Sequence, residues 1–152
     1  MTTEVEILDE VTDEVVEAFA RLLPQLSSSA GQLDAAAIAA VASSPAVTVL
    51  LARSDGRITG SLSLVLFRIP TGLRAWIEDV VVDEAARGQG IGAILTREAL
   101  RLAREAGVRT VDLSTRPSRP RPTARRLTST LRGWPAWARR WWRWRCGPRS
   151  WS

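Results

Sequence analysis

The sequence predicts an α/β domain whose strands and helices lie between Glu4 and Leu113. Two observations predict it. Apolar segments with the alternation of β-strands are separated by turn signals, and a strand–loop–helix–strand unit spans Ala75–Leu113. The chain has 152 residues, of which 45% are apolar, so it can bury one compact core. The predicted element order is β-α-α-β-β-β-α-β.

The first predicted elements are one strand and two helices. Weak alternation predicts a strand at Glu4–Leu8. Thr12 is a suitable N-cap for a helix, which Pro24 is expected to close. An alanine-rich second helix is expected over Leu33–Ala42. The apolar stripe of the first helix comprises Val15, Phe19, Leu22 and Leu23.

Three further strands follow. Val47–Arg53 is expected to be a buried strand, and Ser54-Asp55-Gly56 is a strong hairpin signal before the strand at Arg57–Ile69. The third of these strands is expected at Ala75–Asp83. One face of the middle strand is predicted to carry Ile58, Gly60, Leu62, Leu64 and Leu66, and the other face Ser61 and Ser63.

A polar, glycine-rich loop at Glu84–Gly92 leads into an amphipathic helix. Gly107 is placed to cap the C-terminus of this helix, and Val108–Leu113 is expected to be the next strand. The helical stripe comprises Ile91, Leu95, Ala99, Leu102 and Ala106.

The loop segment Arg87–Gly92 has the properties of an anion site. Its glycines allow backbone N–H groups to approach a ligand closely, and the helix start adds unpaired N–H donors with a partial positive charge. Such a site suits a phosphate or pyrophosphate. The alternative is a tight strand-to-helix turn without a ligand. The segment lacks the Gly-Lys-Ser/Thr of a P-loop and the third glycine of a dinucleotide fingerprint.

The segment Val80–Gly92, VVVDEAARGQGIG, resembles the central motif of the GCN5-related N-acetyltransferase (GNAT) family. Glu84 stands where that family often has proline. The resemblance covers about residues 3–119 and implies a mixed, mainly antiparallel sheet with helices on both faces. It also implies transfer of an acetyl group from acetyl-coenzyme A (acetyl-CoA) to a primary amine of a small molecule or peptide. No metal is expected.

The resemblance also implies site residues. Glu78 corresponds to a carboxylate that acts as a base through water in several relatives, although a solvated strand residue is the alternative. Asp79 is expected to face the opposite side by strand alternation. The family's usual general acid is a tyrosine, which this chain lacks, so a degenerate protein that binds coenzyme A without turnover is a second possibility. The pyrophosphate is expected to contact Arg87, Gly88, Gln89, Gly90, Ile91, Gly92 and Ala93, and the pantetheine arm to pair with Val80, Val81 and Val82.

The last part of the chain differs sharply in composition. Residues 1–112 contain 16 acidic residues and 10 arginines, whereas residues 113–152 contain 11 arginines and no acidic residue. We therefore predict a GNAT-like domain at 1–117 and an Arg/Trp/Pro-rich tail at 118–152. Regrouping the bases of Trp and Arg codons turns Arg140–Arg145 into an apolar run, so we hypothesise a frameshift near Pro120 and an incomplete or non-native C-terminal region.

Two consequences of this tail, and the location of the protein in the cell, are open. Arginine interleaved with tryptophan can bind nucleic acid or an anionic membrane surface, although a solvated tail without a partner is favoured. Loss of the closing strands would expose a sheet edge and favour a homodimer. An acidic N-terminus, a single cysteine and the absence of a long apolar stretch favour a cytoplasmic location.

Overall fold

The computed structural model describes residues 2–27 and 31–113. The chain divides into two units, Met1–Ser114 and Thr115–Ser152, and the second lies outside the described residues, as does the predicted tail. The elements follow the predicted order, with ends that differ from the prediction by no more than three residues. They are β1 (Thr3–Ile7), α1 (Asp13–Leu26), α2 (Ala35–Ala42), β2 (Val47–Ser54), β3 (Arg57–Ile69), β4 (Gly72–Val82), the short 3₁₀ helix η1 (Glu84–Ala86), α3 (Ile91–Glu105) and β5 (Thr110–Leu113).

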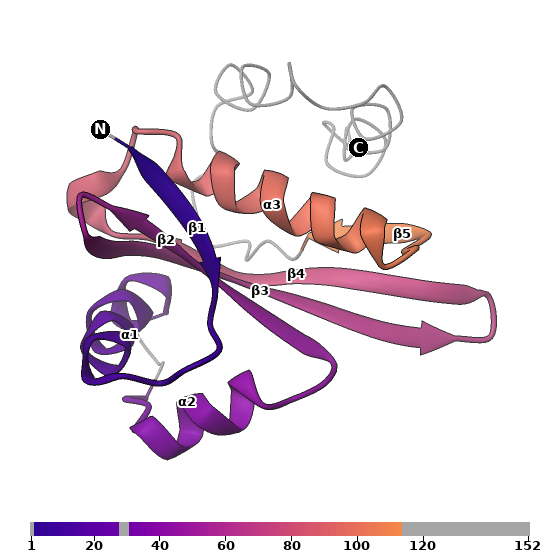
Figure 1. Ribbon diagram of the computed structural model, residues 1–152, viewed down its shortest axis with the longest axis horizontal. Coiled ribbons are helices and arrows are strands. Elements are labelled where there is room, and N and C mark those ends of the chain that lie inside the picture. Colours follow the sequence, from indigo (N-terminus) through magenta and orange to yellow (C-terminus); the bar gives the residue numbers. More distant parts are fainter. Residues whose placement is uncertain (1, 28–30, 114–152) are drawn as a thin grey trace, which may run out of the picture. The chain divides into compact units, whose positions relative to one another are not determined.

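The five described strands form a single sheet in the order β1-β2-β3-β4-β5 (Figure 1). The first four strands pair antiparallel, and β5 pairs parallel to β4. The parallel pair requires a crossover, which η1 and α3 provide. The predicted mixed, mainly antiparallel α/β sheet is therefore confirmed.

Helices cover both faces of the sheet (Figure 1). The α3 face is filled by alternate strand residues such as Leu50, Leu62 and Ile77 against Leu95 of α3. The opposite face packs against α1 and α2, with Val49, Leu51 and Val81 among the strand residues. Because successive residues of a strand point to opposite faces, the two cores share the same strands without sharing side chains.

Helix α1 begins as predicted but ends later. The side chain of Thr12 accepts a hydrogen bond from the N–H of Val15, at 3.4 Å. The prediction that Pro24 closes this helix is wrong, because α1 continues to Leu26 with the proline inside its last turn. A proline there has no N–H to donate to the carbonyl of Ala20, and only one helical hydrogen bond is lost.

Two predicted faces require correction. Ile58 packs with α1 and not with Leu62, because the pairing of β2 and β3 shifts between Ala52 and Arg53 and inserts Thr59 as an extra residue. In α3 the buried stripe ends at Ala103 instead of Ala106, because the helix stops at Glu105. The remaining members of the α3 stripe are buried or partly buried as predicted.

Candidate functional site

The loop between β4 and α3 is held in an open conformation by two glycines. Gly88 and Gly90 have φ angles of +84° and +81°, a region that other residues rarely adopt. A Cβ atom added to either glycine would find no atom within 4 Å, so the space beside the loop is clear. Gly90 is also the N-cap of α3 and provides no side chain to cap the helix.

Five consecutive backbone N–H groups are available in this loop. Arg87 and Ala93, which flank them, use their own N–H groups to donate to Glu84 O at 3.3 Å and Gly90 O at 3.0 Å. Within the part of the chain that the structure describes, no hydrogen bond is formed by the N–H groups of residues 88–92. These amides stand at the positive end of a 15-residue helix, which favours an anion.

The guanidinium group of Arg87 is held by hydrogen bonds within the protein. Its Nε donates to Val82 O at 3.3 Å and its Nη2 donates to Gln25 Oε1 at 3.3 Å. Both the backbone N–H and the guanidinium group of Arg87 are thus engaged within the protein, and contact of Arg87 with a pyrophosphate stays a prediction. Ala93 begins the helical hydrogen-bond pattern, so its N–H is already used.

A bulge lies in β4 next to the other predicted residues. Ser61 pairs with Val81 and Ser63 pairs with Glu78, so β4 has one more residue than β3 between these two pairs. Asp79 occupies the bulge with φ +49°, a left-handed conformation that aspartate tolerates better than most residues. The alternation that would place Glu78 and Asp79 on opposite faces is broken here. Left-handed residues cluster at functional sites.

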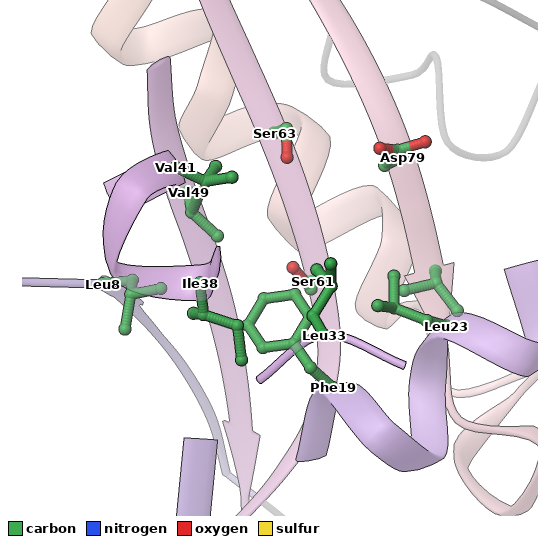
Figure 2. Close-up of a pocket in the computed structure, with 11 residues that line it drawn as sticks. Leu8, Phe19, Leu23, Leu33, Ile38, Val41, Val49, Ser61, Ser63 and Asp79 are labelled. Atoms are coloured by element: carbon green, nitrogen blue, oxygen red, sulfur yellow. The ribbon is translucent and has the colours of Figure 1, made fainter. Parts of the chain in front are cut away.

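Asp79 borders a small cavity between the sheet and helices α1 and α2. Its volume is about 80 Å³, about half that of a cavity that holds benzene. Ser61, Ser63 and Asp79, which come from β3 and β4, are the polar residues of its lining (Figure 2). The apolar wall comprises Leu8, Phe19, Leu23, Leu33, Ile38, Val41, Val49 and Val81.

Val80–Val82 lie between the bulge and the glycine loop. The side chains of Val80 and Val82 pack toward the α3 core, and Val81 is buried on the opposite face. The pairing of β4 with β5 ends at Ile77 and Leu113 among the described residues. Pairing of Val80–Val82 with a pantetheine arm stays a prediction.

Two features of this site were not predicted from the sequence. The carboxylate at the cavity is Asp79, whereas Glu78 is not among the residues that line it. A cluster of Arg21, Gln25 and Asp83 connects α1 to the start of the loop. The hairpin and cap signals that reveal turns carry no information about bulges or about contacts between residues about 60 positions apart.

The chain belongs to the acetyltransferase (GNAT) family, because the model of that family matches residues 8–127. The resemblance derived from the glycine loop is thereby confirmed. No curated protein sequence matches the chain.

Solved structures with this fold include a transcriptional regulator from Bacillus halodurans C-125, which is 26% identical over 89% of this chain and 94% of its own, with a TM-score of 0.69. A Trypanosoma brucei acetyltransferase is 27% identical over 76% of this chain and 84% of its own, with a TM-score of 0.64. Glucosamine-6-phosphate N-acetyltransferase from Arabidopsis thaliana is 21% identical over 77% and 84%, with a TM-score of 0.67, and shows the shared fold.

In the described ranges, none of the helices combines the length and the hydropathy needed to cross a membrane.

Proposed function

We propose that this protein transfers the acetyl group of acetyl-CoA to a primary amine of a small molecule or peptide. The observation that carries the proposal is the row of five N–H groups from Gly88 to Gly92, which have no acceptor among the described residues and stand at a helix N-terminus. Family membership supports the choice of donor.

The loop fits the diphosphate of coenzyme A in three respects. Its N–H groups are donors for phosphate oxygens, and charge-assisted hydrogen bonds of this kind are stronger than neutral ones. Its two left-handed glycines leave room for close approach, since added Cβ atoms would project into empty space. The neighbouring carboxylate of Asp83 is paired with Arg21, so it repels a bound diphosphate less than an unpaired carboxylate would.

The cavity beside Asp79 lies on the α1/α2 face of the sheet and supports the assignment of an acceptor site there. A volume of about 80 Å³ is far below the 300–1,000 Å³ typical of drug-sized ligands. The cavity is therefore suited to a small apolar group of the acceptor, with the amine placed near the carboxylate and hydroxyl groups.

Acyl transfer requires the amine to be neutral when it attacks. An acceptor ammonium loses one proton to a carboxylate at the bulge, either directly or through water, and the nitrogen lone pair then forms a bond to the thioester carbonyl carbon. As the carbon–sulfur bond breaks, the nitrogen loses a second proton to become the amide, and the departing thiolate takes up one proton to leave as the free thiol. Glu78 was predicted for the base, and Asp79 is the second candidate because it borders the cavity.

The proposal is tested in two steps with the full chain. Calorimetric titration with coenzyme A measures binding, and a thiol-reactive dye measures thiol release from acetyl-CoA with a panel of primary amines. Saturable binding with amine-dependent thiol release is the expected result. Absence of binding by folded protein would refute the proposal.

The absence of tyrosine favours a second candidate function. Without the family's usual acid for the thiolate, the protein would bind coenzyme A and not turn over. Binding without thiol release, under conditions in which every amine of the panel is tested, would support this alternative.

A further inference from the structure

Helix α1 is joined to the start of the glycine loop by a partly buried ion pair. Arg21 Nε donates to Asp83 Oδ2 at 2.7 Å, and Arg21 Nη2 donates to Ile58 O at 2.6 Å. Asp83 is only 7% exposed. The hydrogen bond from Arg21 holds the pKa of the Asp83 carboxyl below its usual range, so this carboxyl is ionised at neutral pH.

A second residue of α1 contacts the loop one turn later. Gln25 Oε1 accepts from the N–H of Glu84 at 2.8 Å and from Arg87 Nη2 at 3.3 Å. The Nε2 of the same side chain donates to Arg21 O at 3.2 Å. One side chain thus connects both ends of η1 to the helix. Arg21, Gln25 and Asp83 are called the α1 latch below.

The α1 latch holds the segment Asp83–Arg87, which directly precedes the N–H groups of residues 88–92. Asp83 Oδ1 accepts from the N–H of Ala85 at 3.2 Å, which shapes the η1 turn, and Arg87 is the last residue before Gly88. The two positive-φ glycines that follow are conformationally permissive and pack against nothing beside them. The carbonyl of Gly90 accepts from the N–H groups of Ala93 and Ile94, so α3 holds the far end of the loop and the segment before Gly88 holds the near end.

Resting on the proposed function, we propose that Gln25 and Arg21 are positioning residues for diphosphate binding. They touch no diphosphate themselves. Gln25 acts through Glu84 and Arg87, and Arg21 acts through Asp83. The same helix contributes Phe19 and Leu23 to the cavity wall, so a shift of α1 on acceptor binding would reach the cofactor loop through the latch.

The test uses Gln25→Met in the full chain. Methionine has a similar length and a similar helix propensity but provides no amide oxygen to accept from Glu84 and Arg87. We expect the dissociation constant for coenzyme A to rise about five- to tenfold in calorimetry. The KM for acetyl-pantetheine, which lacks the diphosphate, should stay within about twofold of the wild type.

Glu14→Gln provides the matched control. Glu14 also joins α1 to the sheet, through an ion pair with Arg53 at 2.7 Å, but it lies in the first turn of the helix. This variant should bind coenzyme A as the wild type does. If Gln25→Met fails to fold, Gln25→Asn, whose amide is one methylene shorter, replaces it.

The outcomes separate the two proposals. Failure of the wild type to bind coenzyme A refutes the proposed function. Wild-type binding with unchanged affinity in Gln25→Met overturns only the positioning role. The positioning role would also be overturned if Gln25→Met weakened the use of acetyl-pantetheine as much as it weakens coenzyme A binding. The same holds if Glu14→Gln weakened coenzyme A binding as much as Gln25→Met does. Either result would indicate a general loosening of α1.

Discussion

Replacing Gly90 with alanine should weaken coenzyme A binding far more than it weakens the fold. Gly90 has φ +81°, and a left-handed conformation costs a residue with a Cβ about 1–2 kcal/mol. Reduced freedom of the unfolded chain offsets about 0.4–1 kcal/mol of this cost. No atom lies within 4 Å of the added methyl group, so no clash adds to it. We expect a net loss of about 1 kcal/mol in the free energy of unfolding.

The effect on binding has a different origin. If the backbone at Gly90 relaxes to negative φ, the neighbouring N–H groups turn away from the ligand, and if it does not, the methyl group projects into the open space. Loss of one charge-assisted hydrogen bond costs about 1.5–3 kcal/mol. The dissociation constant for coenzyme A should therefore rise by about tenfold to 150-fold.

Gly107→Ala serves as the control for backbone strain. Gly107 has φ +76°, also has no atom within 4 Å of an added Cβ, and lies at the opposite end of α3. A 15-residue helix places it about 22 Å away. Both variants should lower the melting temperature by about 3–4 °C, and only Gly90→Ala should lower affinity in calorimetry. Equal affinities for the two variants would refute the reasoning.

Three further results are expected. Leu95→Ala, at a position with 0% exposure, should lower the free energy of unfolding by about 2–5 kcal/mol in urea titrations, and a loss below about 1 kcal/mol would contradict the packing described. The pKa of Asp83 is lowered by the hydrogen bond from Arg21, so the pair stabilises the fold above about pH 4 and this contribution is lost as the pH falls through the folded-state pKa. The stability difference between wild type and Asp83→Asn should thus shrink in urea titrations below about pH 4, and a constant difference would argue against the pair. Of Glu78→Gln and Asp79→Asn, the variant that removes the base should lower amine-dependent thiol release by about 10²–10⁴-fold with coenzyme A affinity retained, and unchanged turnover in both would exclude a carboxylate base at the bulge.

Local signals predicted most of the fold because each depends on neighbouring residues. The Asp55-Gly56 turn is one case, since both residues have positive φ as a tight hairpin requires. Thr12 and Gly107 cap their helices as expected, because capping is decided within one turn of the chain. The glycine loop was also recognisable, since its location between a strand and a helix is a local pattern.

The errors come from features that no short window contains. Ile58 lies on the opposite face from the predicted one because Thr59 is an extra residue relative to β2. Such a bulge depends on the partner strand, which a local sequence pattern does not contain. Asp79 borders the cavity for the same reason, through the bulge opposite β3. Pro24 does not end α1, because a proline in the last turn of a helix removes only one hydrogen bond.

The contact between Arg21 and Asp83 could not be predicted from either segment alone. These residues are 62 positions apart, and each looks like an ordinary charged surface residue in its own segment. Only the fold brings them together. The tail at 118–152 and the frameshift near Pro120 lie outside the described residues. Binding of nucleic acid or membrane and formation of a homodimer stay predictions. The cytoplasmic location also stays a prediction.

The central claim is that the N–H groups of Gly88–Gly92 bind the diphosphate of coenzyme A. The most direct test is an ¹H–¹⁵N correlation NMR titration of the full chain with coenzyme A, in which each of these amides is observed. We predict saturable shifts that are largest at the amides of residues 88–92 and are reproduced in part by inorganic pyrophosphate. Saturation of the protein with no shift at these amides would contradict the account.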